Sequence, residues 1–144
     1  MKEQNLSNHA RYVPAYHFFT ATLVIAVLIG SCVNLYGSLG NENRIYSASL
    51  LVAVAVILLF LFWYARAFAL RAQDRAIRAE ENLRHLALTG KLLDPRITMR
   101  QVIGLRFASD EEFVPLARRA AEEKLSKQAI KEAVKQWRAD NHRA

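Results

Sequence analysis

The acidic run Asp110-Glu111-Glu112 is the densest group of side chains in this sequence that could transfer protons. Paired carboxylates can act as general acid and base. Acids that directly follow a serine are equally typical of a helix N-terminus, where free backbone amides and the helix dipole favour negative charge. The sequence contains no glycine-rich phosphate loop, no Cys/His ligand set and no nucleophile-elbow motif. We therefore interpret the run as a helix cap, and predict no enzymatic activity, no metal site and no cofactor.

A second pattern that could do chemistry is a pair of predicted helices on either side of Lys124–Ser126. Ala120 and Ile130 lie roughly where helix-turn-helix DNA readers place packing residues, although Lys124 replaces the glycine typical of the turn. The last helix offers cations that could contact phosphates, namely Lys127, Lys131, Lys135 and Arg138. A solvated basic face beside anionic lipid headgroups is the simpler interpretation. Nucleic acid is therefore not the partner that we expect.

Two apolar runs, Phe18–Gly37 and Ile45–Ala65, are the elements that position everything else, and neither contains Asp, Glu, Lys or Arg. A helix of this length spans about 30 Å, the thickness of the hydrocarbon core of a bilayer. The sequence therefore predicts a transmembrane hairpin over residues 18–65, with an outer loop at 38–44. Because ionisable groups inside spans usually mark ion-coupled transport, their absence argues against a self-contained transporter.

Basic residues near the ends of the spans predict the orientation. Four arginines follow the second span closely: Arg66, Arg71, Arg75 and Arg78. The short loop contains one Arg and one Glu, and the N-terminal stretch contains Lys2 and Arg11. By the positive-inside rule both termini are cytoplasmic, with the four arginines at the lipid headgroups and residues 1–17 as an interfacial segment.

The second span is predicted to continue far beyond the membrane. Between Gly40 and Gly90 there is neither glycine nor proline. A single helix over Ile45–Thr89 would be about 67 Å long, with residues 66–89 as its cytoplasmic extension. Gly90 is expected to end this helix as a C′ cap.

Two patterns of small residues predict self-association. The first span has a stripe at fourfold spacing, made of Thr22, Ala26, Gly30 and Asn34. Such a stripe lets helices approach closely in lipid. The long helix has a sevenfold seam, which holds Ala48, Ala55, Phe62, Ala69, Ala76 and Leu83 at one position and Leu51, Leu58, Ala65, Ala72, Ala79 and Leu86 at the other. An alanine-rich seam with charged flanks is typical of close-packed coiled coils. A lone solvated helix is the alternative, because alanine is the best helix former and a helix rich in Ala, Arg and Glu would show part of this pattern by chance. The partner of the seam is either the same helix of another subunit or the C-terminal helices folded back.

Residues 90–144 are predicted to form a small bundle of three short helices, so the fold class is all-α. The first covers Met99–Ala108 and begins with the capping box Thr98–Gln101. The second begins after Ser109, with a stronger capping box to Glu112, and runs to about Lys124; Pro115 predicts a kink or a later start. The third covers Lys127–Asp140, with Ile130, Val134 and Trp137 on one face.

The whole chain resembles an uncharacterised family of small bacterial membrane proteins, sometimes labelled ABC transporter permeases. The resemblance rests on five stretches besides the two spans: Gln4-Asn5-x-x-Asn8-His9-x-Arg11-x-x-Pro14-x-x-His17, Thr89-Gly90-Lys91, Asp94-Pro95-Arg96-x-Thr98, Arg106 through Glu112, and Trp137-Arg138-x-Asp140. It implies a two-span protein of the bacterial inner membrane with a helical cytoplasmic tail. It transfers no site, because the family has no established activity, and two spans are too few for a permease path.

These observations predict a non-enzymatic, membrane-anchored assembly or scaffold protein. Its expected partners are membrane lipids and further copies of itself, with another membrane protein as an alternative. Self-association would use the stripe and the cytoplasmic part of the seam, anchored by Leu83 and Leu86. One alternative is an oligomeric channel lined by Ser31, Asn34, Ser47 or Ser49. A membrane-tethered DNA-binding protein that uses residues 90–144 is the other.

Overall fold

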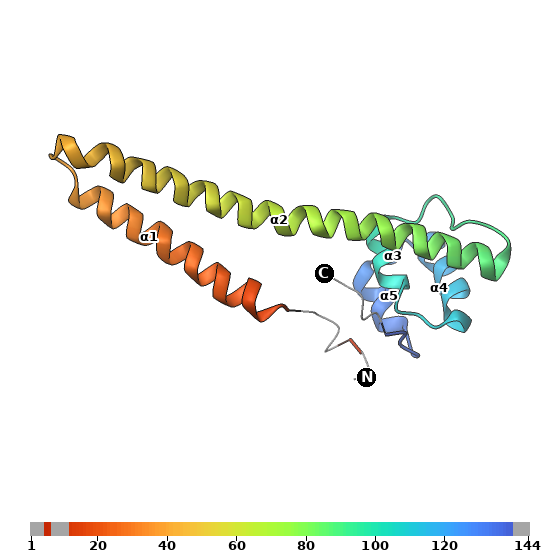
Figure 1. Ribbon diagram of the computed structural model, residues 1–144. Coiled ribbons are helices and arrows are strands. Elements are labelled where there is room, and N and C mark those ends of the chain that lie inside the picture. The colour runs from red at the N-terminus through yellow and green to blue at the C-terminus, as the bar shows by residue number, and fades with distance from the viewer. Residues whose placement is uncertain (1–4, 7–11, 140–144) are drawn as a thin grey trace. The chain divides into compact units, whose positions relative to one another are not determined.

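The computed structural model describes residues 5–6 and 12–139, and within them the chain is helical, with no strand and one isolated bridge between Ala108 and Trp137 (Figure 1). The all-α prediction is confirmed. The predicted interfacial segment 1–17 and the family-typical residues Gln4, Asn8, His9, Arg11 and Asp140 lie largely outside the described residues. In chain order the elements are η1 Ala15–Thr20, α1 Ala21–Gly37, α2 Glu42–Thr89, α3 Met99–Leu105, α4 Asp110–Glu122 and α5 Lys127–Ala133.

The long helix α2 contains 48 residues without interruption, as the lack of glycine and proline predicts. It ends where expected, because Gly90 has a φ of +73° and donates its amide to the carbonyl of Leu86 at 2.8 Å. The helix begins three residues earlier than predicted. Asn41 explains this: its carbonyl accepts from the amides of Arg44 and Ile45, and its side chain accepts from Asn43. The connection between α1 and α2 is therefore shorter than the predicted loop.

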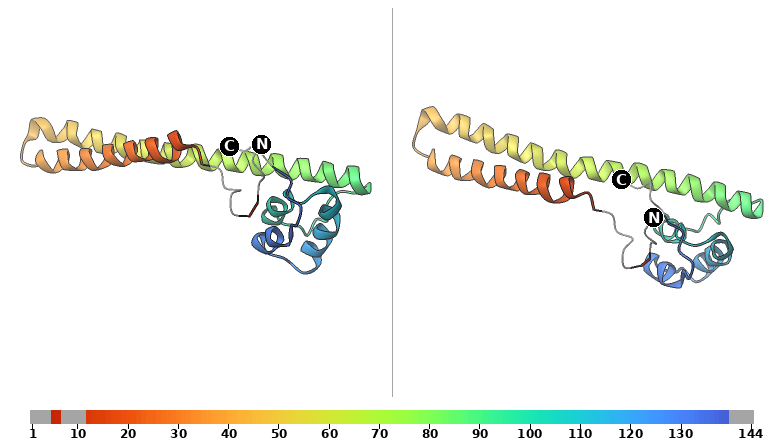
Figure 2. Two further views of the ribbon diagram at one scale, coloured as in Figure 1. Left: turned by 90° about the horizontal axis from the view of Figure 1, so that it is seen from below. Right: turned by 60° about the horizontal axis from the view of Figure 1, so that its bottom comes forward.

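The chain divides into two compact units, one made of residues 12–68 and the other containing residues 69–139, and α2 contributes to both. In the first unit, α1 and the first part of α2 run in opposite directions side by side (Figures 1 and 2). The Tyr16 ring stacks on Phe62 with centroids 4.5 Å apart, and its hydroxyl donates to the Phe62 carbonyl. Ala48 and Ala55 are each 1% exposed. The seam position shared by Ala48, Ala55 and Phe62 is thus used within the chain itself.

The second unit has a core built from α3, α4, α5 and the last part of α2. Leu105, Phe113, Ala120 and Ile130 are completely buried, and Ile77 of α2 belongs to the same cluster. α3 and α5 come very close at Gly104, where an added Cβ would lie 3.0 Å from Cγ2 of Ile130. The C-terminal helices therefore fold back onto α2 of their own chain.

The predicted boundaries of two short helices are wrong. α3 ends at Leu105 rather than Ala108, and α5 ends at Ala133 rather than Asp140. Val134 is extended, and Trp137 packs on Phe107 with ring centroids 4.9 Å apart instead of continuing a helical face. Backbone pairing causes this change. The Ser109 amide donates to Gln136, and the Arg138 amide donates to Phe107, so residues after Val134 bond to a distant segment instead of to their own helix.

The two predicted capping boxes also turn out differently. The box at Thr98–Gln101 is complete, with each side chain bonded to the backbone of the other residue. Ser109 precedes α4 but makes no side-chain cap bond, so the box predicted there is not formed. α4 begins at Asp110 and includes Pro115, so the later start that Pro115 suggested does not occur.

Candidate functional site

The small-residue stripe of α1 lies on exposed surface. Thr22, Ala26, Gly30 and Asn34 are all exposed, and a Cβ added at Gly30 would meet no atom within 4 Å. The side of α1 used within the chain is different, since Ser31 is the buried residue of this helix. The stripe is therefore not occupied by contacts within its own unit.

The cytoplasmic part of the predicted seam is exposed too, at Ala69, Ala72, Ala76, Ala79, Leu83 and Leu86. The bundle packs instead on Ile77 and Glu81, which are 6% and 5% exposed. The seam was expected to contact either the same helix of another subunit or the C-terminal helices of its own chain. The C-terminal helices do not cover these six residues, so the second option is excluded for them. On a straight helix, residues seven positions apart are rotated by about 20° around the helix axis with each repeat. The seam residues beyond Ala48 and Ala55 therefore face a gradually different direction along α2.

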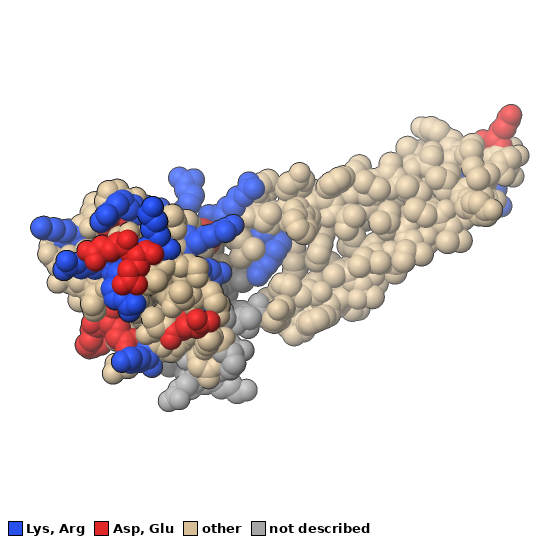
Figure 3. All heavy atoms as spheres, turned by 180° about the vertical axis from the view of Figure 1, so that it is seen from behind, with Lys and Arg blue, Asp and Glu red and all other residues tan. Residues whose placement is uncertain are grey.

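Four arginines follow the apolar part of α2. Arg71 and Arg75 are exposed, whereas Arg66 and Arg78 are half-buried. Figure 3 shows charged side chains over the C-terminal unit, whereas the apolar helices are almost free of charge on the face displayed. The predicted pore residues bond locally: the hydroxyls of Ser31, Ser47 and Ser49 each donate to the carbonyl three residues earlier. Asn34 is exposed.

A buried ion cluster joins α2 to the start of α4, and Arg84 lies at its centre. Its guanidinium contacts Glu81 at 3.1 Å, Asp110 at 2.6 Å and the Ala108 carbonyl at 2.8 Å. It also lies 4.3 Å from the centroid of the Phe113 ring. Burial raises the pKa of Glu81, and the hydrogen bond and charge of Arg84 oppose that rise. The cluster fixes the bundle against α2.

The acidic run has structural partners rather than a shared site. Asp110 pairs with Arg84, and one carboxylate oxygen of Glu112 accepts from the backbone amides of Lys135 and Gln136 at 3.1 and 3.2 Å. Glu112 therefore holds the C-terminal segment instead of closing a capping box. Among the described residues, no group of three or more His, Cys, Asp or Glu side chains is placed to hold a metal ion.

The basic face predicted for the last helix is not formed. Only Lys127 and Lys131 lie on α5, because the helix ends before Lys135 and Arg138. Lys131 is 5% exposed, and its amine lies 5.1 Å from the centroid of the Phe107 ring. Lys124 does take the left-handed conformation that the glycine of such a turn would supply, with φ +52°. The turn thus fits the helix-turn-helix pattern, whereas the helix after it is short and presents few cations.

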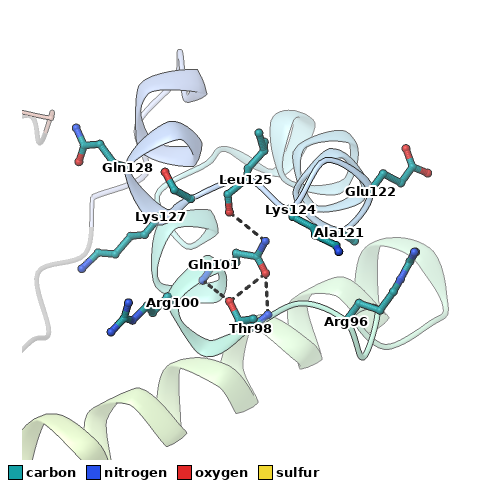
Figure 4. Close-up of a pocket in the computed structure, with 11 residues that line it drawn as sticks. Arg96, Thr98, Arg100, Gln101, Ala121, Glu122, Lys124, Leu125, Lys127 and Gln128 are labelled. Atoms are coloured by element: carbon teal, nitrogen blue, oxygen red, sulfur yellow. Dashed lines mark hydrogen bonds between the residues drawn. The ribbon is translucent and has the colours of Figure 1, made fainter.

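A basic hollow lies where the start of α3 meets the turn between α4 and α5 (Figure 4). Its volume is about 940 Å³, and Arg100, Lys124 and Lys127 are on its lining. Gln101 is 6% exposed at its base. The Gln101 amide nitrogen donates to the carbonyls of Ala120 and Leu125, and its oxygen accepts from Thr98. This single side chain ties three segments together beneath the hollow.

A family model matches residues 1–144, the full length of the chain, and its description is a family of unknown function, DUF6526. The chain belongs to this family. The uncharacterised family expected from the sequence is thereby confirmed, and family membership assigns no activity to any residue. No curated protein and no solved structure matches the chain. Any function of this DUF6526 member must therefore be argued from its own residues.

Sequence reasoning missed the hollow because its cations are far apart in the chain. Arg100 and Lys124 are separated by 24 positions, and no local period connects them. Contacts made by Gln101 bring the two segments together. The place of Gln101 in a capping box is visible in the sequence. The hydrogen bonds that its amide nitrogen donates to the distant carbonyls of Ala120 and Leu125 are not. The partners of Arg84 and Glu112 were missed for the same reason.

Proposed function

We propose that this protein is a non-enzymatic, membrane-anchored scaffold of the bacterial inner membrane. A transmembrane hairpin, made of α1 and the first part of α2, would anchor it. The second unit would lie in the cytoplasm. Copies of the chain would associate through the exposed small-residue stripe and the exposed seam. The observation that supports this most directly is the large apolar surface of residues 12–68 that no other part of its unit covers.

Length, composition and exposure support the membrane anchor. The segments Ala15–Gly37 and Glu42–Thr89 are long and apolar enough to cross a bilayer. Only 6% and 11% of their apolar windows are buried, whereas a core helix of a soluble protein is mostly buried. Large side chains such as Ile25, Leu51 and Leu61 are more than half exposed. Such a surface is a liability in water and the ordinary state in hydrocarbon.

Satisfied hydroxyl groups also suit a lipid surface. In hydrocarbon, a polar group without a partner costs several kcal/mol, of order 2–7. Ser31, Ser47 and Ser49 avoid this cost by bonding to carbonyls of their own helices. Because these hydroxyls already have hydrogen-bond partners, they do not require contact with water. This favours a position of the three serines in a packed or lipid-facing surface over a position in the lining of a pore.

Self-association is supported by the separation of used and unused faces. Within its unit, α1 buries Ser31, while the stripe with Gly30 stays open. In the second unit, α2 buries Ile77 and Glu81, while Leu83 is 66% exposed. Leu83 and Leu86 continue the apolar seam on an exposed side of α2, and coiled-coil contacts bury such seam positions. With the second unit on the cytoplasmic side of the membrane, four arginines would lie at anionic lipid headgroups, namely Arg66, Arg71, Arg75 and Arg78.

The test is the mass of the full-length protein in detergent, measured by light scattering and corrected for bound detergent. We expect a defined oligomer, and expect Leu83→Asp with Leu86→Asp to reduce its mass. The matched control is Leu88→Asp with Leu92→Asp, which adds the same charges at exposed leucines outside the seam. Gly30→Leu, compared with Val33→Leu, tests the stripe in the same way.

A monomeric wild-type protein would contradict self-association. An unchanged mass of the Leu83/Leu86 variant would exclude that contact surface. Equal loss in the control pair would show that added negative charge, rather than the seam, governs the mass. The membrane anchor is tested separately by recovery of the protein with membranes after an alkaline wash, and release into the soluble fraction would contradict it.

A further inference from the structure

The last part of α2 has two different sides. Ile77 and Glu81 are buried under the bundle, which lies along one side of the helix in both views of Figure 2. Successive residues of an α-helix are rotated by about 100°, so the middle of the exposed seam lies about 150° around the helix from these two residues. The exposed seam consists of Ala69, Ala72, Ala76, Ala79, Leu83 and Leu86. This apolar strip therefore faces away from the bundle of its own chain.

The exposed seam is narrow, because polar residues follow both of its edges. Gln73 and Glu80 lie along one edge, and Arg75 and Asn82 lie along the other. A helix inside a larger bundle has an apolar face that is widened by one of these edges, whereas a seam of this width suits contact between two helices. Its large residue Leu83 is 66% exposed. The seam therefore fits a single partner helix.

Arg75 and Glu80 place opposite charges on the two edges, each about 70° from the middle of the exposed seam. Both side chains are exposed, and neither forms an ion pair with another residue in the described parts of the chain. Residues three and four positions apart are neighbours on a helix surface. At this spacing the charged neighbours of Arg75 are Arg71 and Arg78, which repel it. The charge of Arg75 is therefore not balanced along its own helix.

Glu80 is left without a partner for a different reason. The one cation three or four positions away from it in the sequence is Arg84. That guanidinium already contacts Glu81 at 3.1 Å and Asp110 at 2.6 Å. The contacts that fix the bundle thus leave Glu80 free to pair with a cation of another molecule.

The two edge charges become complementary when identical helices lie parallel and in register. In such a pair, a residue on one edge of the first helix meets a residue on the opposite edge of the second helix, in the following repeat. Arg75 of one copy then lies opposite Glu80 of the partner subunit, and two-fold symmetry forms the contact twice. An antiparallel pair brings equal edges together, so that like charges repel.

We propose that the exposed seam binds a second copy of this chain as a parallel, in-register pair of helices, with ion pairs between Arg75 of one copy and Glu80 of the other. This inference rests on the proposed self-association and gives it a direction, a register and a charge pairing. The proposed membrane anchor is compatible with it, because two copies in one membrane leave that membrane in the same direction. Both bundles would lie on the outer sides of the pair.

Cysteine crosslinking tests direction and register. Cys32 is the single cysteine of the chain, so Cys32→Ser provides the background. Ala72→Cys and Leu86→Cys are then introduced one at a time, and membranes are oxidised with copper phenanthroline. A disulfide requires Cα atoms within about 7 Å. We expect both variants to form crosslinked dimers, and expect the control Leu88→Cys, at an exposed residue outside the seam, to form few.

The two positions also separate parallel from antiparallel pairing. Ala72 and Leu86 are about 21 Å apart along the helix. In an antiparallel pair, a residue meets its own copy only at the centre of the contact, so both positions cannot crosslink to themselves. Crosslinking at both is therefore the result that a parallel pair requires.

Charge reversal tests the ion pairs in the full-length protein in detergent, by energy transfer between labelled copies. Arg75→Glu or Glu80→Arg alone gives two edges of one sign and should raise the dissociation constant about threefold or more. A mixture of these two variants restores opposite charges at both contacts and should form mixed pairs in preference to either variant alone. The double variant Arg75→Glu/Glu80→Arg should recover the affinity of wild type. Lys135→Glu is the matched control at an exposed residue of the bundle and should change the constant less than about twofold.

The outcomes distinguish this pairing from the broader proposal. A monomeric wild-type protein would contradict self-association and this pairing with it. A stable oligomer whose seam cysteines crosslink no better than Leu88→Cys would overturn the pairing alone. Crosslinking at only one of the two seam positions would do the same, as would equal weakening by Lys135→Glu or a double variant that stays as weak as the single ones.

Discussion

Replacing Arg84 by methionine should destabilise the second unit strongly, and by an amount that depends on pH. The guanidinium lies between Glu81 and Asp110 and is only 10% exposed. The Glu81 side chain is 7% exposed, so it would remain as a buried carboxylate without its closest cation. Asp110 is 61% exposed and contributes little, because water screens its charge.

Removing one member of a buried ion pair costs about 3–5 kcal/mol, because the other member stays buried and unpaired. Arg138 lies 4.0 Å from Glu81 and offers partial compensation. The Ala108 carbonyl also loses its donor, at a cost of about 1 kcal/mol. We therefore expect Arg84→Met to lower the free energy of unfolding by about 3 kcal/mol at pH 7, near the lower end of the range for buried pairs.

The dependence on pH follows from Glu81. Burial raises its pKa above 4.5, and the loss of Arg84 removes the main opposing cause, so the pKa rises further. A carboxyl whose pKa is higher in the folded than in the unfolded state weakens the fold as the pH rises through that interval. Lowering the pH toward 4.5 protonates Glu81 and should therefore reduce the deficit of the variant relative to wild type.

The assay is denaturant unfolding of the full-length protein in detergent, followed by Trp137 fluorescence in a Trp63→Phe background, since these are the two tryptophans of the chain. Glu81→Leu/Arg84→Met removes both charges and should recover stability to within about 1 kcal/mol of wild type. Arg118→Met is the matched control at an exposed pair and should cost under about 0.5 kcal/mol. A deficit below about 1 kcal/mol, or one that is equal at both ends of the pH range, would refute the assignment of a buried ion pair.

Two further predictions concern the bundle, and both are read from the same unfolding midpoint. Gly104→Ala should destabilise by about 1–2 kcal/mol, because the added Cβ would crowd Ile130 and the Lys127 carbonyl. The cost of this crowding should exceed the gain from the higher helix propensity of alanine. A stabilised variant would disprove this close approach. Lys124→Gly should be neutral or stabilise by up to about 1 kcal/mol, since glycine accepts the left-handed turn. Arg119→Gly, in the interior of α4, should instead cost about 1 kcal/mol, and equal losses at the two positions would contradict the assigned turn.

Elements whose stabilising contacts lie within a few residues were predicted well from the sequence. α2 needs only helix-forming residues without interruption, and a glycine ends it where expected. The capping box of α3 depends on residues three positions apart, so its pattern is visible directly. Apolar length and composition were equally readable for the two candidate spans. The family, too, was evident from the motifs.

Tertiary structure decided whatever depends on contacts between distant residues. α5 ends at Ala133 because the following residues bond to Glu112, Phe107 and Ser109, which lie more than 20 positions earlier. The same physics hid the basic hollow, whose sides are joined through Gln101. Helix propensity acts within about four residues and is written locally in the sequence. The end of a marginal helix and the joining of distant segments around the hollow are set by long-range hydrogen bonds, and these exist only once the chain has folded.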